Sequence, residues 1–131
     1  MEKLRMKTAI KTVKDLKVYL AAYKSAMAIF RITENFPKKE IFSLIDQLRR
    51  SSRSVAVNIR EGYAKRKYKQ VFIRHLNDAL GSSEVTRGWL DFAKDSKYIN
   101  IQDYQDLDRS YDEINAMLYG LMKKWQDFSG T

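Results

Sequence analysis

The chain has 131 residues, 44% of them hydrophobic, and carries a formal net charge of +9 with no cysteine and one histidine. Without cysteine it has no disulfide, no thiol nucleophile and no thiolate metal ligand, and one histidine excludes a histidine dyad or a multi-histidine metal site within one chain. One proline and five glycines leave few chain breaks, so the composition favours long helices in a single domain.

The apolar segments of the sequence are too short to cross a membrane. No window approaches the ~20 consecutive apolar residues that a membrane-spanning helix needs. Residues 1–11 are basic but lack the apolar stretch of a secretory signal. We therefore expect a cytoplasmic protein without a membrane anchor, in which residues 1–11 form a basic tail.

A first helix is predicted over residues 12–35. Thr12, followed three residues later by Asp15, resembles a capping box, and Pro37 ends the helix because the residue before a proline leaves the helical region. Apolar residues recur between these points every three or four positions, which is typical of one buried face. The members of this expected stripe are Leu16, Tyr19, Leu20, Tyr23, Met27 and Phe30.

A second helix is predicted over residues 38–64, with Pro37 in its first turn, where a missing N–H costs nothing. Its apolar positions fall within roughly 110° of arc at the helical repeat of about 100° per residue. They are Ile41, Leu44, Ile45, Leu48, Ser52, Val55, Ile59, Gly62 and Tyr63. Residues 64–67 then form the connection.

Two further helices are predicted over residues 68–96 and 100–127, the last one capped by Asn100. In the third helix, the interior Gly81 suggests close approach of another helix or a tolerated cost. The third helix has a main apolar face and a second strip, and the fourth has a strict heptad seam. The main face of the third helix consists of Phe72, Leu76, Ala79, Leu80, Ser83, Leu90 and Ala93, and its second strip consists of Val85, Trp89 and Phe92. The heptad seam of the fourth helix consists of Tyr104, Leu107, Tyr111, Ile114, Leu118, Leu121 and Trp125. Short connections predict an all-α, antiparallel up-down-up-down four-helix bundle.

The positive charge is concentrated in the first half of the chain. Residues 38–69 carry ten Lys or Arg against three acids, whereas residues 99–131 carry three against six. One side of the molecule is therefore expected to be cationic, which suits a polyanionic partner. Ordinary solubility is the alternative reading of the same charge.

The second helix and the turn after it hold the main candidate site. Arg49, Arg53 and Arg60 fall within about 40° on a helical wheel, beside the buried stripe. Arginine matches phosphate with a planar fork and stacks on bases. The candidate nucleic-acid-binding residues are Arg49, Arg50, Arg53, Arg60, Lys65, Arg66, Lys67 and Lys69, with Tyr63 and Tyr68 as candidates for stacking on unpaired bases. The alternatives are that these arginines serve subunit contacts, pair with acids of neighbouring helices, or are simply solvated.

No residue pattern indicates catalysis, a cofactor or a metal. The single His75 is expected on the surface or at the rim, and the sequence has no glycine-rich phosphate loop. The acids of the fourth helix are expected to be a solvated face: Asp103, Asp106, Asp108, Asp112 and Glu113. We therefore expect a protein that is not an enzyme.

Two strings in the sequence resemble a known family. The first reads Gln47-Leu48-Arg49-Arg50-Ser51, then Ser54-Val55, then Asn58-Ile59-Arg60-Glu61-Gly62, and the second reads Ala79-Leu80-Gly81-Ser82-Ser83-Glu84. Together they resemble the four-helix-bundle proteins encoded in intervening sequences of bacterial 23S ribosomal RNA genes, over roughly residues 15 to 125. The motif positions carried over are Asn58, Glu61, Gly62, Gly81, Ser82 and Glu84, without a catalytic role. Arg53 and Arg60 depart from the small residues usual in the family, so part of the basic stripe belongs to this protein.

The resemblance implies a ring-like homopentamer and a similarity to the accessory variability determinant proteins of diversity-generating retroelements, which bind nucleic acid and a reverse transcriptase. Two hypotheses follow. The first is an oligomeric nucleic-acid-binding protein, a chaperone or scaffold for structured RNA or RNA–DNA hybrids. The second is a protein-interaction module that docks a partner such as a reverse transcriptase, with its arginines serving interfaces.

Overall fold

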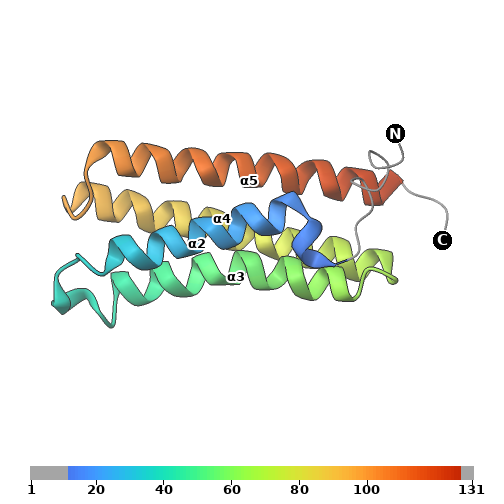
Figure 1. The fold of residues 1–131 in the computed structure, drawn as a ribbon, viewed down its shortest axis with the longest axis horizontal. Helices are drawn as coiled ribbons and strands as arrows, with labels where there is room; N and C mark the ends of the chain where they lie inside the picture. The colour runs from blue at the N-terminus through green and yellow to red at the C-terminus, as the bar shows by residue number, and fades with distance from the viewer. Residues whose placement is uncertain (1–11, 128–131) are drawn as a thin grey trace.

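The structure, a computed structural model, describes residues 12–127 and contains only helices within that range. The expected basic tail 1–11 lies outside the described residues. Four α-helices run along the long axis and alternate in direction from one to the next (Figure 1). They are α2 (Lys17–Thr33), α3 (Leu44–Ala64), α4 (Lys69–Asp95) and α5 (Ile101–Asp127), with two short 3₁₀ helices, η1 (Val13–Asp15) and η2 (Lys38–Glu40). No helix of the described range is long and apolar enough to cross a membrane.

The first predicted helix is divided at Leu16. The capping box at Thr12 is present, but it caps only the 3₁₀ turn η1, because Leu16 has extended backbone angles (φ −84°, ψ 123°). The α-helix therefore begins at Lys17, five residues later than predicted. The break turns Val13 and Leu16 into the core, where both are buried, so their burial offsets the lost helical hydrogen bonds.

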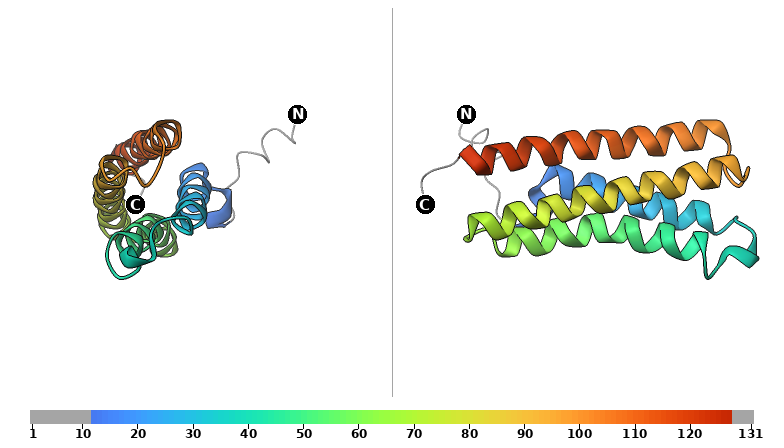
Figure 2. Two further views of the ribbon diagram at one scale, coloured as in Figure 1. Left: turned by 90° about the vertical axis from the view of Figure 1, so that its left-hand side faces the viewer. Right: turned by 180° about the vertical axis from the view of Figure 1, so that it is seen from behind.

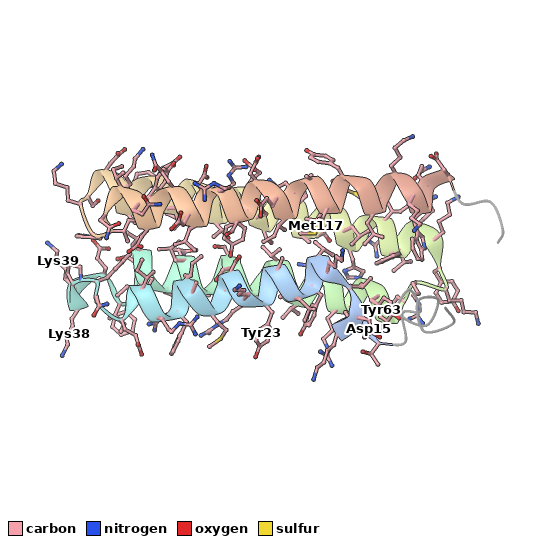
Figure 3. All side chains as sticks on the ribbon, turned by 45° about the horizontal axis from the view of Figure 1, so that its top comes forward. Asp15, Tyr23, Lys38, Lys39, Tyr63 and Met117 are labelled. Atoms are coloured by element: carbon pink, nitrogen blue, oxygen red, sulfur yellow. The ribbon has the colours of Figure 1, made fainter. Side chains whose placement is uncertain are left out.

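The buried face of α2 differs from the predicted one by about one residue, or about 100° of rotation. The buried face consists of Val18, Tyr19, Ala22, Ser25, Ile29 and Thr33. Of the predicted stripe, Leu16 and Tyr19 are buried, whereas Leu20, Tyr23 and Met27 are 50%, 55% and 37% exposed. Tyr23 points away from the bundle (Figure 3). Small or polar side chains share the core face with Val18, Tyr19 and Ile29, and three of the large apolar side chains remain outside.

The second predicted helix begins later than expected, at Leu44. Pro37 adopts extended angles and precedes the turn η2 instead of lying inside a helix. Glu40 anchors this connection, because its carboxylate accepts hydrogen bonds from Ser43 Oγ and, at 2.8 Å, from Tyr98 Oη beyond α4. These hydrogen bonds lower the pKa of Glu40.

The core is continuous through the bundle, and the predicted faces of α3, α4 and α5 are largely confirmed. The largest fully buried apolar side chains are Ile29, Leu48, Val55, Ile59, Phe72, Leu76, Leu90, Tyr111, Ile114 and Leu118. Ile41 is an exception at 46% exposure. The end-on view shows α3 between α2 and α4, with α5 beside α4 (Figure 2). Among the neighbouring α-helices, contact is most extensive between α3 and α4 and least extensive between α2 and α5.

Candidate nucleic-acid interface

The predicted basic residues divide between three places on the structure. We call Arg49, Arg53 and Arg60 the arginine strip, which lies on α3 against α2, and we call residues 65–69 the basic turn, which joins α3 to α4 at one end of the bundle (Figure 1). Arg50 lies apart from both. Its side chain is 73% exposed and faces Asp46 at 3.9 Å, one turn back on the same helix.

Arg49 joins α3 to α2. Its Nε donates to Thr33 Oγ1 at 2.9 Å, and its Nη2 donates to the Phe30 carbonyl at 3.2 Å. Its guanidinium carbon also lies 4.5 Å from the centre of the Phe30 ring. These contacts cap the end of α2 and leave Arg49 partly buried, so its observed role is in the packing of the two helices.

Arg53 and Arg60 are exposed and lie over aromatic rings of α2. The Arg53 guanidinium carbon is 5.8 Å from the Phe30 ring centre. Arg60 is 5.7 Å from the Tyr19 ring centre, and its Nη1 donates to the Tyr19 hydroxyl at 3.1 Å. Among the described residues neither arginine has a carboxylate partner. The rings hold the two cations by cation–π attraction, which leaves their outer N–H groups facing solvent.

The contacts of the basic turn within the described residues include an ion pair and the approach of cations to aromatic rings. Lys65 Nζ lies 2.7 Å from Glu61 Oε2, and this hydrogen bond is the main cause that lowers the pKa of Glu61. Arg66 donates to the Tyr63 carbonyl at 2.9 Å and covers the Tyr63 ring at 3.9 Å. Lys67 Nζ lies 5.7 Å from the centre of the Tyr68 ring.

The two tyrosines predicted to stack on bases have different surroundings. Tyr63 is only 8% exposed and lies beneath Arg66 at the end of the bundle (Figure 3), so a base cannot reach its ring. This corrects the expectation for Tyr63. Tyr68 is 61% exposed and remains a candidate for stacking. Phe30 and Tyr19 were not predicted as residues of the site, because both were assigned to the apolar stripe of the first helix. In the structure their rings support the arginine strip.

A shallow groove runs along the outer side of α3 and α4, next to Arg50. Small and polar side chains line it, including Ser51, Ser54, Gly81 and Ser82. A Cβ atom at Gly81 would meet nothing within 4 Å, so within one chain this glycine does not mark a close helix approach. The groove is therefore open in the single chain.

The comparisons with known proteins agree on one family. Residues 14–120 match the family described as 23S rRNA-intervening sequence protein. The chain belongs to this family. The crystal structure of a protein of unknown function from the S23 ribosomal protein family of Bacteroides thetaiotaomicron is similar, with a TM-score of 0.72 and 28% sequence identity. The similarity covers 81% of this chain and 98% of that one. No curated protein matches the chain.

In this 23S rRNA-intervening sequence protein, the motif position Gly62 allows α3 to approach α4. A Cβ atom on Gly62 would lie 2.7 Å from the Cβ of His75 and 3.1 Å from Phe72. His75 is 8% exposed and packs between α3 and α4, which corrects the expectation of a histidine on the surface or at the rim. Its Nδ1 lies 3.3 Å from Asn58 Oδ1, and its Nε2 lies 3.8 Å from Glu61 Oε2. Asn58 and Gly62 therefore position His75.

Small polar residues continue this helix contact along α3 and α4. Ser54 and Ser82 share a hydrogen bond of 2.8 Å between their hydroxyls, and Thr86 donates to Ser51 at 2.8 Å. Asn58 Nδ2 donates to the Ser54 carbonyl at 3.0 Å. The serines of the two family strings thus connect α3 and α4.

Glu84, the last motif position, belongs to an ion cluster between α4 and α5. Arg87 binds Asp108 with two hydrogen bonds, of 2.8 and 3.1 Å, and also contacts Glu84 at 3.2 Å. Asn115 Nδ2 donates to Glu84 at 2.7 Å. The bond to Asp108 is the main cause that raises the pKa of Arg87. The described residues contain no group of three or more acidic, histidine or cysteine side chains arranged to hold a metal ion.

Proposed function

We propose that this member of the family is a non-enzymatic, oligomeric nucleic-acid-binding protein whose ligand is RNA. The proposal is based on the exposure of Arg53 and Arg60 and on the contacts that support them. Both are exposed cations supported from below by the aromatic rings of Phe30 and Tyr19, without a carboxylate partner among the described residues. Guanidinium groups held in this way are oriented for phosphate before any ligand arrives.

The spacing of the strip suits a nucleic-acid backbone. Arg53 and Arg60 are seven residues apart on a helix, a rise of about 10 Å. Successive phosphates of one strand of a DNA duplex are spaced by about 3.4 Å along its axis, so two such cations span about three steps of a duplex of that rise. The basic turn extends the positive surface toward one end of the bundle.

The excess of negative charge on α5 makes the charge distribution of the molecule asymmetric. Residues 99–131 hold six acids against three cations, and Asp106, Asp112 and Glu113 are exposed on α5. A polyanion is repelled by α5 and attracted to the side of α3. This asymmetry favours binding by one defined face over a diffuse attraction to the whole molecule.

The proposal includes assembly into a homopentamer. Large apolar side chains are exposed on two separate sides of the bundle, which monomers seldom show over contiguous areas. Leu20, Tyr23 and Val57 flank the arginine strip, and Phe42, Val85 and Phe92 lie on the outer side of α3 and α4. Two different apolar faces suit a head-to-tail ring, in which each basic face is repeated and weak contacts add up.

The same exposed faces favour a second candidate, a module that docks a protein partner such as a reverse transcriptase. Phe42 is 92% exposed and Phe92 is 62% exposed, beside the partly buried Trp89. Aromatic side chains of this kind are enriched at the centres of protein interfaces. In this alternative the arginine strip contributes to an interface between proteins.

A salt titration of RNA binding tests the proposal. If the protein contacts ~6 phosphates, its affinity for mixed RNA falls by about 10³ between 50 and 200 mM salt. Arg60→Glu then weakens binding by about tenfold or more, whereas Arg109→Glu, the same charge change on α5, has a smaller effect. Light scattering monitors the assembly, for which a pentamer has about five times the mass of the 15.4 kDa chain. Absence of binding at 50 mM salt refutes the proposal, and dissociation of Arg60→Glu into monomers assigns the strip to the subunit interface.

A further inference from the structure

A hollow lies at the end of the bundle where the basic turn meets the last turn of α5. Its described lining includes Arg66, Lys67, Tyr68, Lys69, Val71 and Trp125. Trp125 lies nearly sixty residues from the basic turn in sequence, so only the folded chain brings the two together. The hollow is separate from the arginine strip, which lies along the middle of α3.

Two aromatic side chains of different character line the hollow. Trp125 is partly buried and held by Phe72, with ring centres 4.8 Å apart and planes at 84°. Its ring orientation is therefore set by the core. Tyr68 is 61% exposed on the turn, and Val71 adds an apolar surface between the helix ends. A planar, partly apolar ligand matches these walls better than a bare anion does.

The rim of the hollow is cationic. Arg66, Lys67 and Lys69 line it, and none of the described lining residues is acidic. Arg66 is held in place by its bond to the Tyr63 carbonyl and by the Tyr63 ring, and Lys67 lies near the ring of Tyr68. An aromatic wall beside Arg66 and Lys67, whose positions these contacts define, is complementary to a base joined to a phosphate.

We propose that this hollow binds an unpaired nucleotide of the nucleic acid, with its base stacked on Tyr68 beside Trp125 and its phosphates against Arg66, Lys67 and Lys69. The inference rests on the proposed nucleic-acid function and adds a preference within it. The arginine strip contacts backbone phosphates of any sequence, whereas the hollow selects RNA that carries a single-stranded end or a bulged base. An acidic peptide would use the cations without needing the aromatic wall.

The test uses the full chain with Trp89→Phe, which leaves Trp125 as the sole tryptophan. The probes are an RNA hairpin with an unpaired four-nucleotide 3′ overhang, the same hairpin with an abasic overhang, and the blunt hairpin. We expect the overhang to quench Trp125 fluorescence and to bind about tenfold tighter than the abasic probe. Tyr68→Ala abolishes that difference, and Tyr68→Phe retains it. Tyr119→Ala is the matched control, because Tyr119 is 60% exposed on α5 and lies outside the hollow.

The outcomes separate this inference from the proposed function. If the normal and abasic overhangs bind equally, or if Tyr68→Ala behaves like Tyr119→Ala, the hollow does not bind an unpaired nucleotide. Salt-dependent binding of all three probes would still support nucleic-acid binding by the arginine strip. Absence of binding by every probe at 50 mM salt overturns both. Poly-glutamate that displaces the overhang probe and binds equally well to the wild type and to Tyr68→Ala assigns the hollow to acidic peptides and also overturns the inference. If Trp89→Phe does not fold, anisotropy of labelled RNA with the Tyr68 and Tyr119 variants gives the same comparison.

Discussion

A Cβ atom on Gly62 would lie 2.7 Å from the Cβ of His75, so the backbones of α3 and α4 meet at a point where no larger residue fits. The obstructing atom is itself fixed to the backbone of α4, and therefore it cannot move aside as the end of a long side chain would. The two helices must separate to accept any substitution. Gly62 thus determines how closely α3 and α4 pack, and it also fixes the position of His75 between Asn58 and Glu61.

Gly62→Ala is therefore expected to destabilise the protein by about 1–3 kcal/mol, because overpacking outweighs the gain in helix propensity. Urea denaturation measures the change. Gly120→Ala is the control, since a Cβ there meets nothing within 4 Å and alanine is favoured in a helix by up to about 1 kcal/mol. If both variants were stabilised equally, the close contact at Gly62 would not exist in solution.

Arg49 and Arg53 are expected to differ in what they support, although both contact Phe30. Arg49→Ala removes two hydrogen bonds and the closer ring contact, and we expect a loss of about 1.5–3 kcal/mol in the free energy of unfolding. Arg53→Ala changes stability by no more than about 0.5 kcal/mol, because Arg53 is exposed. For RNA binding we expect the opposite order, in which Arg53→Ala weakens the affinity more than Arg49→Ala does. Thermal denaturation and an RNA titration of the two variants check this, and a binding loss confined to Arg49→Ala would contradict it.

The sequence was sufficient to predict the helices but not the rotation of the first one. On α3, α4 and α5 the large apolar residues mark the core, and Leu48, Leu76 and Ile114 are fully buried as their spacing indicates. On α2 the core face mixes Val18, Tyr19 and Ile29 with small or polar residues such as Ala22 and Ser25, while the apolar residues Leu20, Tyr23 and Met27 lie outside. Hydrophobic periodicity detects size and polarity, and therefore it followed the wrong face.

The sequence predicted which residues form the candidate site but not how they are arranged. Spacing on a helical wheel placed Arg49, Arg53 and Arg60 together, and the structure keeps them on one side of α3. The wheel could not supply the neighbouring helix, whose contacts distinguish the partly buried Arg49 from the exposed Arg53 and Arg60. The position of Trp125 beside the same hollow as the basic turn likewise depends on tertiary structure alone.

Glu40 is expected to make stability depend on pH at the acidic end. Its pKa is lowered below the ordinary value of 4.5, first by the hydrogen bond from Ser43 and then by that from Tyr98. A carboxyl group with a lowered pKa stabilises the fold above its ordinary pKa, and this contribution is lost as the pH falls through the folded value. The melting temperature of the wild type should therefore exceed that of Glu40→Gln at pH 7, and the gap should narrow as the pH falls below 4.5 and passes through the lowered pKa of Glu40. A gap that stays constant down to pH 2 would contradict this origin.

Arg87 and Asp108 are expected to couple strongly, because two parallel hydrogen bonds join them across α4 and α5 and the arginine side chain is only 24% exposed. In a double-mutant cycle with Arg87→Leu and Asp108→Leu, we expect a coupling of about 1–3 kcal/mol. The matched control is Arg109 with Asp106, an exposed pair on α5 at 3.2 Å, for which the coupling should not exceed about 0.5 kcal/mol.

The single variants add a further distinction within the Arg87 cluster. Arg87→Leu leaves Glu84, Asp108 and Asp112 without their shared cation, so it should cost more than Asp108→Leu, after which Arg87 still contacts Glu84. Added salt should narrow that difference, because it screens the repulsion among the remaining carboxylates. Urea denaturation at low and high salt measures both effects. If the two single variants lower the free energy of unfolding equally, the contact between Glu84 and Arg87 does not stabilise the fold. The presence of Glu84 in the motif would then depend on the hydrogen bond that it accepts from Asn115.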